Sequence, residues 1–205
     1  MVEKESQQTK ASEDLWPKIV KKGIANAVSG LAQMVGQEIS STSSSSRRVL
    51  VKDVPDLFGG VETEAVMVYL GITGTSTGHM AVIYPPKTAF QMVDLLMGLE
   101  PGSTKGLEEM AESALAEMGN IIGSFFLNAL VLETGLDLRP SPPAVMFDMV
   151  GAILDIVLAE ISAVSDDVML VETTFGTADQ QIDGTFLVMP TPELMDIVLK
   201  TAAAS

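Results

Sequence analysis

The chain has 205 residues, 47% of them hydrophobic, so it is long enough to bury a sizeable core in one large domain. Its formal net charge of −15 disfavours nucleic acid and anionic membranes as partners, because both attract basic surfaces. The absence of cysteine excludes a disulfide, a thiol nucleophile and a Cys-ligated metal site. The single histidine, His79, cannot form a histidine cluster, so we expect no metal site and a structural or exposed His79.

The polar segment 1–10 lacks the apolar core of a secretion signal. Polar residues interrupt the most apolar stretches, near 121–132 and 145–161, before either reaches the length of a membrane span. We therefore expect a cytoplasmic protein without membrane insertion. The acidity fits both a salt-rich cytoplasm and an ordinary acidic protein, so a halophilic origin, archaeal or bacterial, stays open.

The first half of the chain predicts a mixture of helices and strands. Residues 1–11 predict a disordered tail, and 14–38 a helix with Pro17 in its first turn. The serine-rich segment 40–46 predicts a flexible loop. The elements expected after it are a strand at 47–53, a turn at 55–60, strands at 63–71 and 78–84 joined by a turn at 73–77, and a helix from Pro85 to about Met97.

The second half repeats this plan, beginning with a long helix from about Thr104 to Glu133 that Gly135 ends. The elements expected after it are an extended segment with Pro140, Pro142 and Pro143, a helix at 146–161, strands at 168–175 and 182–189 around a turn at 177–181, and a final helix from Pro190 to about Lys200.

Two local matches indicate an internal duplication. Residues 78–86 resemble residues 184–192, and residues 23–31 lie over residues 122–130. We therefore predict an α/β (α+β) fold with pseudo-two-fold symmetry, in which helices, two of them long and equivalent, cover a mostly antiparallel sheet. Residues 12–205 would form a single domain of two pseudo-repeats, about 12–100 and 104–203.

The most informative motif is a polar stripe in the second long helix. Ser113, Glu117, Asn120 and Ser124 recur at helical spacing, and the opposite face is apolar. A glutamate and an asparagine held together could enter a partner's active site and hold a water there. The alternative is an ordinary solvent-facing surface. Ser113 is either a partner contact or a small surface residue. For Asn128 we expect a buried hydrogen bond rather than a third contact with a partner. Gly119 and Gly123 would permit close packing of the helix or the close approach of a partner's backbone.

At these residues the chain resembles the CheC/CheX/FliY group of chemotaxis phosphatases, and CheC in particular. The signature of that group is Asp or Ser, three residues, Glu, two residues, Asn, then twenty-two residues and Pro. Here Ser113, Glu117, Asn120 and Pro143 fit it. The flanking segments carry the likeness further, over essentially everything after residue 12: 53–60, 119–124, 128–130, 140–143 and 151–154.

The resemblance implies hydrolysis of the phospho-aspartate of a CheY-type response regulator. By analogy with the family, Asn120 orients the attacking water and Glu117 pairs with the receiver's active-site lysine, with Ser113 and Pro143 in support. The receiver would supply the acyl phosphate and its Mg²⁺, and this chain would need no cofactor of its own. Because an acyl phosphate is labile, positioning a water is a large part of the task.

The first half departs from the signature. Alignment of the two long helices places Asp14, Lys18 and Lys21 over Ser113, Glu117 and Asn120, and Ser44 over Pro143. Lysine cannot accept a hydrogen bond from water and would repel a receiver lysine. We therefore expect one competent site and one degenerate site. The alternative function is a non-catalytic regulatory module that binds CheD, phospho-CheY or both.

Overall fold

The computed structural model describes residues 2–162, 166–177, 181–182 and 184–202. In chain order the elements are α1 (Val2–Val35), β1 (Ile39–Leu50), the short 3₁₀ helices η1 (Val51–Asp53) and η2 (Pro55–Phe58), β2 (Glu64–Gly74), β3 (Gly78–Tyr84), α2 (Pro86–Met97), α3 (Glu109–Thr134), β4 (Leu138–Pro140), β5 (Ala144–Met149), α4 (Val150–Ser162), β6 (Asp167–Thr177), β7 (Gln181–Ile182), β8 (Thr185–Pro190) and α5 (Pro192–Ala202).

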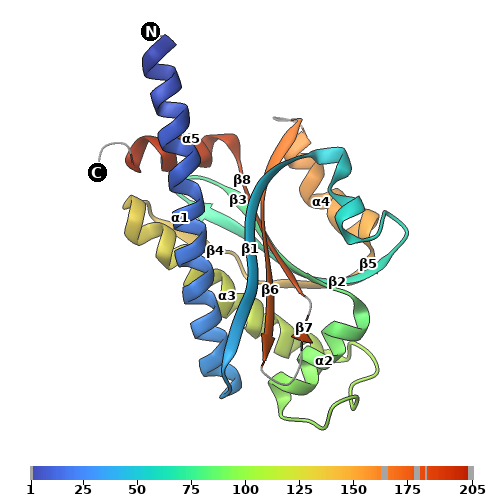
Figure 1. The fold of residues 1–205 in the computed structure, drawn as a ribbon. Coiled ribbons are helices and arrows are strands. Elements are labelled where there is room, and N and C mark those ends of the chain that lie inside the picture. The colour runs from blue at the N-terminus through green and yellow to red at the C-terminus, as the bar shows by residue number, and fades with distance from the viewer. Residues whose placement is uncertain (1, 163–165, 178–180, 183, 203–205) are drawn as a thin grey trace.

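The described strands pair only in antiparallel fashion. One group has the order β4-β2-β3-β8, with β5 also on β2, and the other has the order β1-β6-β7. Strand β6 contacts β8, so the two groups continue each other in space (Figure 1). The predicted class, helices on a mostly antiparallel sheet, is confirmed.

Each face of the sheet carries its own hydrophobic core, because side chains alternate along a strand. Val66, Val68 and Leu70 of β2 point to the core under α1, α2, α3 and α5. Ala65 and Met67 point to the opposite core, which α4 and the two 3₁₀ helices cover. The sheet is therefore the middle of three layers (Figure 1).

The two halves of the chain are arranged about a pseudo-two-fold axis. When Gly78 is aligned with Gly184, Ala81 of β3 aligns with Leu187 of β8. These two equivalent residues are also partners in the antiparallel pairing of β3 with β8, as a two-fold axis between them requires. The long helices agree with the predicted alignment as well, since the buried positions between residues 19 and 31 of α1 all have buried counterparts in α3: Ile19, Val20, Gly23, Ile24, Ala27, Gly30 and Leu31 over Met118, Gly119, Ile122, Gly123, Phe126, Ala129 and Leu130.

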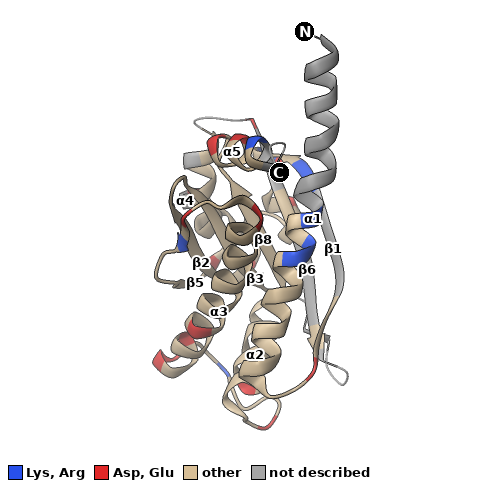
Figure 2. Cartoon of the chain, turned by 90° about the vertical axis from the view of Figure 1, so that its left-hand side faces the viewer, with Lys and Arg blue, Asp and Glu red and all other residues tan. Residues whose placement is uncertain are grey.

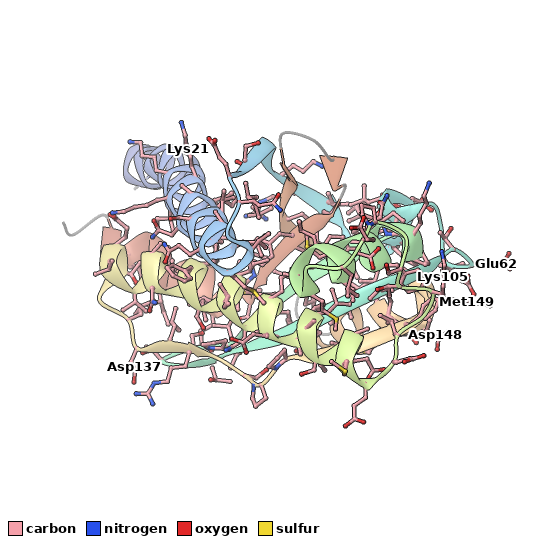
Figure 3. The ribbon with its side chains drawn as sticks, turned by 90° about the horizontal axis from the view of Figure 1, so that it is seen from below. Lys21, Glu62, Lys105, Asp137, Asp148 and Met149 are labelled. Atoms are coloured by element: carbon pink, nitrogen blue, oxygen red, sulfur yellow. The ribbon has the colours of Figure 1, made fainter. Side chains whose placement is uncertain are left out.

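Helices α1 and α3 lie side by side and antiparallel (Figures 1 and 3). A Cβ placed on Gly30 would come within 2.4 Å of the Phe125 ring, so glycine is what permits this approach. Farther along, Lys22 forms an ion pair with Glu133. Lys21, next to Lys22 on α1, lies on the opposite side of the molecule from Lys105 and Asp148 in Figure 3.

Two predictions for the first half are wrong. Residues 2–11, predicted to be disordered, belong to α1, where Glu, Lys, Gln and Ala all favour a helix and Pro17 is interior. The segment 40–46, predicted to be a flexible loop, belongs to β1, which pairs with β6 along its length. Pairing with a strand more than a hundred residues away overrides the weak strand preference of serine.

In the second half, residues 146–149 are strand rather than helix, because β5 pairs with β2 from Tyr69 to Glu64. Helix α3 begins at Glu109, later than the predicted Thr104. Its end at Gly135, which has a φ of 69°, agrees with the prediction. The remaining helices and strands lie close to the predicted ranges, and residues 178–180 of the predicted turn at 177–181 lie outside the described residues.

Among the described helices, α3 is long and apolar enough to cross a membrane by length and composition alone. The core helix of a soluble protein meets the same criterion, and half of the most apolar window of α3 is buried in this fold.

Candidate functional site

The candidate site lies on α3, which two glycines hold close to the sheet. A Cβ on Gly119 would come within 2.4 Å of Val68 Cγ1, and one on Gly123 within 3.2 Å of Leu70 Cδ2. Of the two roles predicted for these glycines, close helix packing is therefore confirmed. Because the inner face of α3 is pressed onto β2, its outer face is presented on a rigid element.

The outer face of α3 carries the polar stripe that the sequence predicts. Ser113 and Glu117 are exposed, and Asn120 and Ser124 are half-buried. Within the part of the chain that the structure describes, none of these four side chains takes part in a hydrogen bond or an ion pair. Their donors and acceptors are thus available to water or to a partner molecule.

Pro143, the last residue of the predicted signature, lies half-buried just before β5. The chain between β4 and β5 forms two hydrogen bonds with Gly71 of β2. The amide of Gly71 donates to Ser141 Oγ at 2.8 Å, and the amide of Ser141 donates to the Gly71 carbonyl at 2.8 Å. Both β5 and α3 contact β2, and they contact each other.

The prediction for Asn128 is wrong. Its side chain is exposed, not buried against the sheet. It lies one turn beyond Ser124 and extends the stripe toward the C-terminal end of α3. Helical spacing alone placed Asn128 near the edge of the apolar face, where a small error in rotation decides burial.

The segment that leads into α3 is held by a buried carboxylate that sequence reasoning did not single out. Asp94 of α2, 2% exposed, accepts hydrogen bonds from the Thr104 hydroxyl at 2.7 Å, the Thr104 amide at 2.8 Å and the Gly102 amide at 2.6 Å. Burial alone would raise the pKa of Asp94, but the hydrogen bonds from Thr104, Gly102 and Ser103 outweigh burial and lower it.

The positions of the first half that align with Ser113, Glu117 and Asn120 lie on α1. Lys18 and Lys21 are exposed, and Lys22 beside them pairs with Glu133. Asp14 also belongs to α1, and Ser44 lies in β1 just after its register shift. Figure 2 shows the contrast in charge, with basic residues on α1 and acidic residues at the start of α3.

His79 has a structural environment, one of the two alternatives predicted. It is 5% exposed, and its Nδ1 lies 2.9 Å from the hydroxyl of Tyr69 across the β2–β3 pair. Among the described residues, no group of three or more His, Asp or Glu side chains is placed to hold a metal ion.

Comparisons with known proteins define the class. Residues 66–160 match the family model of chemotaxis phosphatase CheX. FliY from Thermotoga maritima superposes with a TM-score of 0.76 at 21% identity, over 94% of this chain and 96% of that one. The FliG–FliM complex from H. pylori gives 0.65 at 10% identity, over 95% and 98%. These two likenesses show the fold that the chain shares with FliY and with a chain of the FliG–FliM complex.

A sequence relative places the chain within that class. The CheY-P phosphatase CheC of Bacillus subtilis is 33% identical over 162 residues, which cover 78% of each protein. The chain belongs to the CheC family, as the motifs around Glu117 and Asn120 suggest.

Proposed function

We propose that this protein hydrolyses the phospho-aspartate of a CheY-type response regulator through a single site on α3. The observation that carries the proposal is that Glu117 and Asn120 stand on the outer face of a rigid helix without hydrogen-bond partners among the described residues. The name of the B. subtilis relative, CheY-P phosphatase CheC, supports the substrate.

In the proposed mechanism Asn120 enters the receiver's active site. Its carboxamide accepts a hydrogen bond from a water and orients it in line with the acyl phosphate. Attack forms a new P–O bond and breaks the bond to the aspartyl oxygen, so the products are inorganic phosphate and the free aspartate. The receiver's own Mg²⁺ would neutralise charge on the phosphoryl group.

Glu117 lies three residues before Asn120, on the same face of the helix. We propose that its carboxylate pairs with a lysine of the receiver and so sets the position of Asn120. Positioning accounts for the task without a nucleophile from this chain, which agrees with its lack of cysteine.

The corresponding face of α1 is proposed to be inactive. Lys18 and Lys21 take the places of Glu117 and Asn120, and both are exposed where they would meet a partner. An ammonium group cannot accept a hydrogen bond from the water, and it would repel a receiver lysine.

The alternative is a non-catalytic module that binds CheD, phospho-CheY or both. The degenerate α1 face favours it, since one site has already been lost. A chain with the same fold is part of the FliG–FliM complex from H. pylori, which supports an interaction role.

Phosphate release from the cognate phosphorylated receiver decides between the two. The proposal expects wild-type protein to accelerate release and the Asn120→Ala variant to lose the acceleration. Release that wild-type protein leaves unchanged, together with measurable binding of the phosphorylated receiver or CheD, would establish the module instead.

A further inference from the structure

Two exposed apolar side chains mark the ends of the polar stripe. Met110 is 71% exposed and Leu132 is 76% exposed, the largest values among the bulky hydrophobic residues that the structure describes. Met110 lies two helical turns before Glu117, and Leu132 lies one turn beyond Asn128. All of them therefore follow one line along the outer face of α3.

Single exposed hydrophobic residues are common on protein surfaces, so exposure by itself is weak evidence. The comparison with α1 supplies an independent observation. In the alignment that matches the buried positions of the two helices, Met110 corresponds to Ala11 and Leu132 to Gln33. The helix with lysines in place of Glu117 and Asn120 thus also lacks both large apolar side chains.

We propose that the outer face of α3 from Met110 to Leu132 is one docking surface for the receiver, with Met110 and Leu132 as apolar anchors on either side of the Glu117–Asn120 pair. This inference rests on the proposed function. The surface is about 33 Å long at 1.5 Å per residue, which suits the contact area of one globular partner of ordinary size. Ser124 and Asn128 would supply polar contacts between the centre and the Leu132 end.

The occupant follows from the pattern of side chains. A second copy of this chain also carries a net charge of −15, so two copies repel each other overall. A receiver instead offers a cationic lysine to Glu117 and a phosphoryl group to Asn120. Burial of the apolar ends against its rim then adds affinity without taking part in the reaction.

The test compares Met110→Ser, Leu132→Ser and the double variant with Val61→Ser, a control whose side chain is 56% exposed outside α3. Two quantities are measured: the Kd for the receiver loaded with a stable phosphoryl mimic, and the maximal rate of phosphate release at saturating receiver. Each anchor substitution is expected to raise Kd roughly fivefold to tenfold, with the maximal rate unchanged.

The outcomes separate this inference from the proposed function. If the anchor variants bind the receiver with the same Kd as the Val61→Ser control, the proposed docking surface is wrong, even where the wild-type protein is fully active. An effect at Met110 but none at Leu132 overturns a surface that spans the helix. A wild-type protein that binds the receiver through both anchors without releasing phosphate refutes the phosphatase and leaves the docking surface standing.

Discussion

Gly119 of α3 and Val68 of β2 approach so closely that a methyl group on Gly119 would lie 2.4 Å from Val68 Cγ1. Gly119 immediately precedes Asn120, so this contact sets the height of the candidate site above the sheet. Val68 is fully buried and β-branched, so its side chain has little freedom to move away. The packing of one residue pair therefore connects the core to the functional face.

We expect Gly119→Ala to destabilise the protein by about 1–3 kcal/mol, because overpacking outweighs the better helix propensity of alanine. Phosphate release should fall as well, because α3 must shift. The matched control is Gly106→Ala, since a Cβ on Gly106 would meet no atom within 4 Å. Chemical denaturation of both variants checks the prediction, and equal midpoints would contradict it.

Asn120→Ala should lower the maximal rate of phosphate release roughly 100-fold, because the water loses its positioning group. Stability should change by less than about 0.5 kcal/mol, since the side chain has no hydrogen-bond partner among the described residues. Gln33→Ala, at an exposed amide side chain of α1, is the control and should keep nearly the full rate. A stable Asn120→Ala protein with wild-type activity is the result that would exclude the proposed role.

Glu117→Gln keeps the shape of the side chain and removes its charge. We expect weaker receiver binding and a shallower dependence of binding on salt, because the ion pair with the receiver lysine is lost. Measuring Kd between low and high ionic strength for both proteins tests this. Parallel salt dependence in the two proteins would mean that Glu117 meets no cation in the complex.

Asp94→Asn should destabilise the protein by about 1.5–3 kcal/mol at neutral pH, because a carboxylate accepts the hydrogen bonds of Thr104 and Gly102 better than an amide. The pKa of Asp94 is lower in the folded protein than in the unfolded chain. Its contribution is therefore complete above the unfolded value of about 3.9 and disappears as the pH falls through the folded value. Denaturation of both proteins at a series of pH values should show the stability difference shrinking below about pH 4.

Lys18→Ala combined with Lys21→Ala should leave phosphate release within about twofold of wild type, because the proposed mechanism assigns no role to the α1 face. Both lysines are exposed, so folding should be unaffected. The same assay applied to the pair tests whether the first site is inactive. A large loss of rate would assign a function to α1 and contradict the asymmetry.

Much of the fold was predictable because it depends on local patterns. The amphipathic run of α3, its end at Gly135 and the strand-to-helix steps at Pro86 and Pro192 all agree with the structure. Two of the failures share one cause. Segment 40–46 and residues 146–149 became strands through pairing with β6 and β2, partners that no local window contains.

By itself, the sequence determined the identity and spacing of Glu117 and Asn120, the lysines at the matching positions of α1, and the internal repeat, because residue type and helical period are local properties. Only the tertiary structure decided which way those helices face. In the folded chain Gly119 packs against Val68, and α1 lies antiparallel to α3. Asn128, Met110 and Leu132 are exposed. Burial depends on contacts between residues far apart in the chain, so the exposed face of the candidate site follows only from the assembled core.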